Sequence, residues 1–434
     1  MSDVTPGPGA VEEVKQPERP KLIEILGPGL ITGASDDDPS GIATYSQVGA
    51  QFGYGIGWTL LVTYPLMCAI QQISADIGRV TGDGLAGNLR RYYSPSVLYG
   101  LVGLLLIANT INIGADLGAM GAAVKLLVDG PALLYVALFA IVTVGLEIFV
   151  RYSRYVSVLK WLTLSLFAYV ATVFVVKVPW ASVALGVVWP HLSMSGAYLT
   201  AVVAVFGTTI SPYLFFWQAE EEVEDQEESP GMEPLREAPG QSVRALSRIR
   251  IDTYIGMAFS NLVALAIVIT TAATLHASGH TDIQTSAQAA EALRPIAGRF
   301  AFTIFALGII GTGLLALPVL AGSAAYALGE ALQWPVGLAR KPLRAKAFYG
   351  AIAVATAIGM VLNFTPIDPI KALFWSAVIN GVVAVPVMVM MMVMAVRGKV
   401  MGQFVLSLPL RVMGWLATAV MAAAAVGMFA TWGD

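Results

Sequence analysis

The residues best suited to chemistry in this chain are three consecutive aspartates followed by a proline. They form the sequence Asp36-Asp37-Asp38-Pro39-Ser40-Gly41, inside an otherwise apolar stretch that runs from about Ile23 to Phe52. An ionisable side chain at membrane depth costs several kcal/mol unless it faces a cavity, a partner or a bound ion. Proline removes a backbone donor and breaks the helix at this point. A broken, acidic membrane helix of this kind predicts a cation site.

A second stretch repeats this pattern in the sixth apolar segment. The apolar run VVAVFG gives way to Thr208-Thr209-Ile210-Ser211-Pro212-Tyr213, and the apolar run then resumes. At such a break the last carbonyls of the first half-helix carry partial negative charge, which suits a cation. We expect Thr208, Thr209 and Ser211 to supply ligand oxygens from hydroxyls or carbonyls. The alternative is that these small residues satisfy backbone groups or pack between helices.

The three aspartates have more than one interpretation. Asp38 is either a direct ligand of the cation or the cap of the helix that follows it. The membrane setting favours the ligand, because an unpaired cap there would be costly. For Asp36 and Asp37 three roles are open: attracting cations in a vestibule, pairing with a basic side chain, or remaining protonated.

One further acid, Asp116, stands alone in the apolar third segment, within NTINIGADLGAMG. It is a proton or ion relay, a partner of a ligand, or a paired structural charge. Asn109 and Asn112 precede it on the same predicted helix. We interpret both as hydrogen-bond partners between helices.

The composition identifies the membrane as the setting of these residues. The chain has 434 residues, of which 57% are hydrophobic and 12% charged, against roughly 25% charged residues in soluble domains. The single cysteine excludes a disulfide framework and a cysteine metal cluster. No metalloprotease or serine-hydrolase constellation is present, so we expect no enzymatic activity. We also expect no cofactor, no nucleic-acid partner and no obligate protein partner; the partners are the lipid bilayer and the transported ion.

Apolar segments of about 20 residues predict eleven membrane helices. Their approximate cores are 23–52 (broken), 56–77, 95–123, 131–149, 155–177, 196–220 (broken), 251–274, 300–327, 347–363, 370–396 and 409–431. Residues 1–20 are rich in proline and charge and are expected to be a disordered cytoplasmic tail. Residues 21–434 then form a single transmembrane domain.

The basic residues orient these helices. With the N-terminus inside, all but five of the 25 Lys and Arg residues fall on the cytoplasmic side. The exceptions are Lys125, Lys177, Arg294, Arg299 and Lys371. This bias follows the positive-inside rule. We therefore expect an integral protein of the inner or plasma membrane, with a cytoplasmic N-terminus and the C-terminus outside.

The spacing of the two broken helices predicts the topology. They lie five helices apart, so they cross the membrane in opposite directions. This is expected of an inverted five-plus-five repeat with its substrate site at the midplane. The repeats would cover about 21–178 and 196–396, followed by an extra helix at about 409–431. The predicted fold class is an all-α polytopic membrane protein.

Several segments carry a family resemblance. They are GPG at 27–29, GAQFGY at 49–54, QQISADIGRVTGDGLAGNLRRYYS at 71–94, ADLG at 115–118 and KALFWS at 371–376. With the Asp-Pro of the first helix, they resemble the Nramp (natural resistance-associated macrophage protein) divalent-metal transporters over nearly the whole length after the tail. The resemblance implies a LeuT-like fold, in agreement with the predicted repeat, and a metal ion as substrate.

The departures from the family pattern concern the metal ligands. The family's Asp-Pro-Gly-Asn is Asp38-Pro39-Ser40-Gly41 here, so the aspartate remains and the ligating asparagine is replaced by glycine. The methionine and histidine around the second proline are replaced by Ser211 and Tyr213. A glutamine of the tenth helix and a glutamate of the third are replaced by Ala377 and Ala119.

These losses predict a harder and wetter site. A thioether favours transition metals, whereas a site with few oxygen ligands suits Mg²⁺, which keeps several of its waters. The pattern resembles the Nramp-related magnesium transporter branch, which moves Mg²⁺ and also Mn²⁺ with weak proton coupling. Tyr213 and Ala119 agree with weak coupling, and Asp116 leaves it open. The alternatives are a proton-coupled Mn²⁺/Fe²⁺ importer of the parent type and an organic-solute carrier on the same fold, which the three aspartates disfavour.

Overall fold

The computed structural model describes residues 32–33, 35–150, 162–338 and 340–432. The predicted tail, most of the first half of the first helix and the segment 27–29 lie outside the described residues, as does the start of the predicted fifth helix. Within the described residues all regular secondary structure is helical. This agrees with the requirement that a chain in lipid satisfies its backbone groups within each segment.

The long helices are α3 (Pro39–Phe52), α4 (Trp58–Thr81), α6 (Pro95–Lys125), α7 (Ala132–Phe149), α11 (Gly196–Thr209), α12 (Pro212–Glu228), α13 (Ser242–Thr274), α16 (Ala301–Leu332), α17 (Lys346–Leu362), α18 (Pro369–Ala395) and α20 (Leu408–Ala430). Shorter α-helices are α5 (Leu85–Tyr92), α9 (Phe167–Val175), α10 (Trp180–Val188), α14 (Ser286–Glu291), α15 (Arg294–Ala297) and α19 (Gly398–Met401). Single 3₁₀ turns are η1 (Gly53–Ile56), η2 (Leu162–Leu166), η3 (Pro239–Gln241), η4 (His276–Ser278), η5 (Gly298–Phe300) and η6 (Pro342–Arg344).

Membrane-spanning helices account for most of the chain. By length and composition, 8 described helices are able to cross a membrane, or up to 9 if the bent pair Leu164–Val175 and Trp180–Val188 is one span. Every predicted segment except the first and fifth corresponds to a described helix with similar ends. The largest differences are at two helices that run further than predicted: α12 continues to Glu228 and α13 begins at Ser242. Their extra turns are rich in Glu and Arg, which are good helix formers outside the bilayer.

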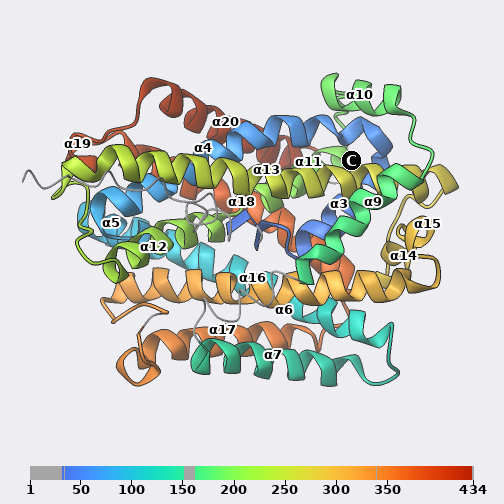
Figure 1. Ribbon diagram of the computed structural model, residues 1–434, viewed down its shortest axis with the longest axis horizontal. Helices are drawn as coiled ribbons and strands as arrows, with labels where there is room; N and C mark the ends of the chain where they lie inside the picture. Colours follow the sequence, from blue (N-terminus) through green and yellow to red (C-terminus); the bar gives the residue numbers. More distant parts are fainter. Residues whose placement is uncertain (1–31, 34, 151–161, 339, 433–434) are drawn as a thin grey trace, which may run out of the picture.

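The helices form a bundle around a broken centre (Figure 1). On one side α6 packs against α16, α17 and α7, and on the other α13 packs against α4. The elements α3, α11 and α18 lie between these groups and contact one another. The two helix breaks that the sequence predicts therefore meet inside the protein, away from lipid.

Proline positions explain where the central helices begin. Pro39 and Pro212 each occupy the first turn of a helix, where the missing N–H has no partner to lose. Two residues separate α11 from α12, and Ile210 has φ −121° and ψ 61°, outside the helical region. The sixth predicted helix is therefore broken at the predicted proline.

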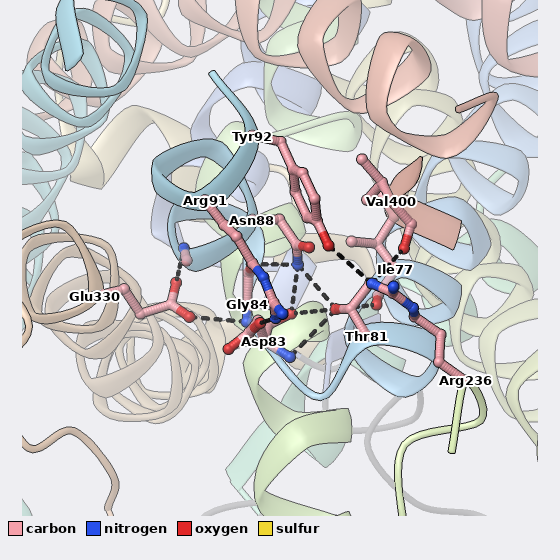
Figure 2. A network of polar contacts seen from close by, with 11 residues as sticks. Ile77, Thr81, Asp83, Gly84, Asn88, Arg91, Tyr92, Arg236, Glu330 and Val400 are labelled. Atoms are coloured by element: carbon pink, nitrogen blue, oxygen red, sulfur yellow. Dashed lines mark hydrogen bonds and ion pairs between the residues drawn. The ribbon is translucent and has the colours of Figure 1, made fainter. Parts of the chain in front are cut away.

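A short helix closes one end of the bundle. The helix α5 lies beside the end of α16, where Glu330 accepts hydrogen bonds from the backbone N–H groups of Gly84 at 2.8 Å and Gly87 at 2.9 Å (Figure 2). Asn88 donates to Thr81 Oγ1 and to the carbonyl of Asp83, both at 2.8 Å. A carboxylate at a helix N-terminus satisfies free N–H groups and opposes the helix dipole. Glu330 thus fixes α5 to α16.

Removing this carboxylate should loosen that end of the bundle. We expect Glu330→Ala to lower the free energy of unfolding by about 2–3 kcal/mol, since two hydrogen bonds to a charged group are lost. Thermal unfolding of the purified protein measures the change. Glu291→Ala is the matched control, because among the described residues the Glu291 side chain has only an exposed i,i+3 pair with Arg294 at 2.6 Å and such pairs contribute little. Equal melting temperatures for the two variants would contradict the assigned role.

Candidate metal site

Asp38 lies between the first described turn and α3, and its two carboxylate oxygens have different surroundings. Oδ1 accepts from Ser40 Oγ at 2.6 Å and from the Gly41 N–H at 2.7 Å, which is an N-cap arrangement. Oδ2 receives only long contacts, from Asn112 Nδ2 at 3.3 Å and from the Tyr213 hydroxyl at 3.4 Å. The side chain is buried. Capping therefore uses one oxygen and leaves the other facing the centre of the bundle.

The break between α11 and α12 faces Asp38. Ser40 Oγ lies 3.4 Å from Thr208 Oγ1, so the two broken helices approach each other through these hydroxyls. The last carbonyls of α11 have no helical donor beyond the break, and they carry the partial negative charge of a helix C-terminus. Thr208 is thus brought next to Ser40, whose hydroxyl donates to the Asp38 carboxylate.

The other two hydroxyls of this break point at their own helix. Ser211 Oγ donates to the carbonyls of Gly207 at 2.6 Å and Thr208 at 3.0 Å. Thr209 Oγ1 donates to the carbonyl of Val205 at 2.8 Å. Such back-bonding occupies the hydroxyl hydrogens and leaves their oxygens as acceptors. Of the three predicted oxygen donors, Thr208 contacts Ser40 beside Asp38, while Ser211 and Thr209 bond to α11.

Asp36 and Asp37 lie against a different helix. Ser260 of α13 contacts both, with its Oγ 2.6 Å from Asp36 Oδ2 and 3.2 Å from Asp37 Oδ1. Both aspartates are buried, and each has one carboxylate oxygen without a hydrogen-bond partner among the described residues. None of the ion pairs found within the described part of the chain includes either of them. Among the described residues, their side-chain hydrogen bonds are thus with α13 and not with the partners of Asp38.

Asp116 is linked to Asp38 through the side-chain amide of Asn112. Asn112 lies one turn before it on α6, and Asn112 Nδ2 is 3.2 Å from Asp116 Oδ2 as well as 3.3 Å from Asp38 Oδ2. Asn112 Oδ1 in turn accepts from Asn380 Nδ2 of α18 at 3.0 Å. Tyr213 adds a contact to the carbonyl of Ser35 at 3.4 Å. Two acids from different helices are thus bridged by one asparagine.

Some of these partners were foreseen and others were not. The prediction for Asn109 is confirmed, because its amide donates to Leu320 O and Ser323 Oγ of α16, both at 2.9 Å. Asn112 is an interhelical partner as predicted, but its link to Asp38 was missed. The i,i+4 spacing indicates only the contact of Asn112 with Asp116. Asn380 and Ser260 were missed, although an amide in the apolar run of α18 was a visible signal.

Comparison with known proteins identifies the family to which this chain belongs. Residues 29–431 match the family described as "Natural resistance-associated macrophage protein-like". The chain belongs to the Nramp family. It is 29% identical over 317 residues to a divalent metal cation transporter MntH of Pectobacterium carotovorum, covering 71% of this chain and 73% of the relative. A divalent metal cation transporter MntH of Klebsiella pneumoniae is 27% identical over 406 residues, covering 92% of each.

Solved structures agree with this fold. The Eremococcus coleocola manganese transporter superposes with a TM-score of 0.71 at 18% identity, covering 94% of this Nramp chain and 88% of that chain. Mhp1, a nucleobase-cation-symport-1 family transporter, gives a TM-score of 0.57 at 13% identity and covers 94% and 93% of the two chains. At these identities the likeness concerns the fold alone. It confirms the predicted all-α, LeuT-like class for this Nramp protein.

Gly41, where the resemblance implies an asparagine in the family, is closely bordered by other groups near Asp38. A Cβ atom at Gly41 would lie 3.3 Å from Tyr45 Cε2 and 3.4 Å from both the Asp36 carbonyl oxygen and Thr208 Oγ1. In this Nramp protein the position is therefore bordered by two oxygens and an aromatic edge. A side chain there would have to displace one of them.

Proposed function

We propose that this Nramp-family protein imports hard divalent cations, Mg²⁺ first and Mn²⁺ second, by alternating access. The observation that carries the proposal is the environment of Asp38: one carboxylate oxygen receives only long contacts, and the facing break carries the hydroxyl residues Thr208 and Ser211. Hard oxygen ligands suit Mg²⁺ and Mn²⁺. Proposed ligands are Asp38, Thr208, Thr209 and Ser211, the latter three through hydroxyl or carbonyl oxygens.

The orientation that we propose follows the basic residues. The end that carries α5 and α19 (Figure 1) also carries Arg79, Arg236 and Arg340, and would face the cytoplasm. The end of α20 would then lie outside. Movement of the first and sixth helices against their neighbours would open Asp38 to each side in turn. The two inverted repeats, at about 21–178 and 196–396, supply these elements.

The rivals make different predictions. The relatives' names, divalent metal cation transporter and manganese transporter, favour Mn²⁺ as a substrate and agree with a proton-coupled Mn²⁺/Fe²⁺ importer. Mhp1 shows that the same fold serves organic solutes. An organic carboxylate would meet Asp36, Asp37 and Asp38, which are buried together without an ion pair among the described residues. Like charges at close range oppose that substrate.

Uptake and binding test the proposal directly. Purified protein in proteoliposomes should take up Mg²⁺ and Mn²⁺ without strong acidification of the lumen, and calorimetry should show no preference for Cd²⁺ over these ions. Tight, preferential Cd²⁺ binding would overturn the hard-site assignment. Acidification during Mn²⁺ uptake, with weak competition by excess Mg²⁺, would support the parent-type importer.

A thioether at the break between α11 and α12 should shift the preference of the metal site toward softer metal ions. We expect Ser211→Met to raise the ratio of Cd²⁺ to Mg²⁺ affinity about tenfold, equivalent to about 1.4 kcal/mol, because sulfur prefers softer metals. Calorimetric titration of both ions measures the ratio. Ser323→Met is the matched control, since it adds the same group on α16, where Ser323 contacts Asn109 at 2.9 Å. An unchanged ratio in Ser211→Met would place that position away from the ion.

A further inference from the structure

Two buried asparagines form an amide pair beside Asp38. Asn112 of α6 and Asn380 of α18 are both fully buried, and they are joined by the hydrogen bond from Asn380 Nδ2 to Asn112 Oδ1 at 3.0 Å. The NH₂ group of Asn112 points the other way, toward Asp38 Oδ2 at 3.3 Å and Asp116 Oδ2 at 3.2 Å. The pair thus connects two helices to the carboxylate that faces the centre.

The two amides of the pair differ in how many of their polar atoms are hydrogen-bonded. Asn380 Oδ1 is buried but has no hydrogen-bond partner among the described residues. A buried amide oxygen without a donor is costly. An asparagine amide has nearly the same shape in its two orientations, with NH₂ and oxygen exchanged, and its terminal torsion is broadly two-fold. If the Asn112 amide is reversed, its NH₂ group faces Asn380 and its oxygen faces Asp38.

The separation from Asp38 fits a shared ion. Two ligand oxygens at adjacent corners of an octahedron with bonds of about 2.1 Å lie about 3.0 Å apart. In the reversed orientation Asn112 Oδ1 takes the place that Nδ2 now holds, 3.3 Å from Asp38 Oδ2. This distance is close to that of two oxygens bound to one Mg²⁺ or Mn²⁺. In the present orientation the NH₂ hydrogens compete with a cation for the same carboxylate oxygen.

We propose that Asn112 is a further ligand of the transported ion, whose amide turns to present its oxygen when the ion binds Asp38. Asn380 is the positioning residue that makes both orientations possible. It donates to Asn112 when the site is empty. When the site is filled, the Asn380 amide turns as well, so that the oxygen that now lacks a partner accepts from the Asn112 NH₂ group. The proposal rests on the proposed function in taking Asp38 as an ion ligand. It also makes Asp116 lose its Asn112 contact whenever the ion is bound.

Asparagine substitutions test the proposal with Mn²⁺ as the probe. For the full-length protein in detergent we expect Asn112→Leu to weaken calorimetric Mn²⁺ binding about tenfold or more, an effect in the range seen when groups around a metal are removed. Asn112→Asp, which has only acceptor oxygens, should bind Mn²⁺ at least as tightly as the wild type. If Asn112 acted only as a fixed donor to Asp38, Asn112→Asp would bind more weakly.

A spectroscopic measurement separates ligation from packing. The infrared difference spectrum on adding Mn²⁺ should contain a shifted asparagine C=O band that Asn112→Leu abolishes. Asn109→Leu is the matched control on the same helix, since Asn109 contacts only α16 among the described residues, and it should retain the band. Unchanged Mn²⁺ affinity in Asn112→Leu, or an unchanged difference band, would overturn the proposal.

Failure of the Asn112 ligand role can be distinguished from failure of the proposed function. Absence of Mg²⁺ uptake by the wild type, together with Mn²⁺ binding that depends on Asn112, would refute Mg²⁺ as substrate and support the ligand role. Mg²⁺ uptake by the wild type, together with unaltered Mn²⁺ binding in Asn112→Leu, would support the function and overturn the ligand role.

Discussion

Asp38→Asn is expected to fold like the wild type and to lose ion uptake. Asparagine is as good an N-cap as aspartate, so its side-chain oxygen keeps the bonds that Oδ1 now accepts from Ser40 at 2.6 Å and the Gly41 N–H at 2.7 Å. The oxygen that faces the centre becomes an NH₂ group, which cannot bind a cation. We expect Mg²⁺ and Mn²⁺ affinity to fall on the order of 100-fold, or about 2.7 kcal/mol. Calorimetry and proteoliposome uptake measure the loss.

Two further variants isolate the ligand role from the capping role. Asp38→Ala removes both, so it should bind no ion and also melt at a lower temperature than Asp38→Asn, because loss of an N-cap costs about 1 kcal/mol. Asp83→Asn is the control for loss of one negative charge. Within the described part of the chain, the Asp83 side chain forms only an exposed 3.4 Å pair with Arg91. Uptake by Asp38→Asn within about twofold of the wild type would refute the central assignment of this site.

Gly207→Ala is expected to disrupt the crossing that holds the second break in place. A Cβ atom at Gly207 would lie 2.7 Å from Gly381 Cα and closer still to the Gly381 nitrogen and the Ala377 carbonyl oxygen. These are backbone atoms of α18, so no side-chain rotation relieves the contact. Overpacking of this kind costs about 1–3 kcal/mol or more. Because Gly207 is one residue before Thr208, the helices can separate only by moving the site.

We therefore expect this substitution to reduce both the stability of the protein and its affinity for the metal ion. Gly207→Ala should lower the melting temperature and also weaken Mn²⁺ binding, as measured by thermal unfolding and calorimetry of the purified protein. Gly103→Ala is the matched control on α6, because nothing lies within 4 Å of its Cβ position, and alanine is the better helix former. Wild-type stability in Gly207→Ala would mean that α11 and α18 are not closely packed at this crossing.

Much of the fold could be predicted because membrane helices are encoded locally. A segment of about 20 apolar residues must form a helix in lipid, since no water satisfies its backbone groups. The ends of α6, α7 and α20 agree with the predicted segments 95–123, 131–149 and 409–431 to within about two residues. Both breaks also follow from single prolines, Pro39 and Pro212, whose effects are local.

The short connections were less predictable. The helix α10, Trp180–Val188, bends back by 120° from the preceding Leu164–Val175. It has only nine residues, so it is too short to span and falls below the length that marks a membrane helix. The extension of α13 to Ser242 was missed for a similar reason: its first turns are polar, and polar turns are not recognised by hydropathy.

The sequence by itself determined that three acids lie at a proline break and that a second proline break follows in the sixth apolar segment, and its resemblance to the family implied that sulfur and amide ligands are replaced. These are properties of residue type and spacing. Only the tertiary structure decided how the three acids differ: Asp38 joins Asn112 and Tyr213, whereas Asp36 and Asp37 meet Ser260 of α13. Adjacent residues at an unwound point project in different directions, and partners such as Asn380 lie hundreds of residues away. Local pattern carries no information about that convergence, which helix packing alone creates.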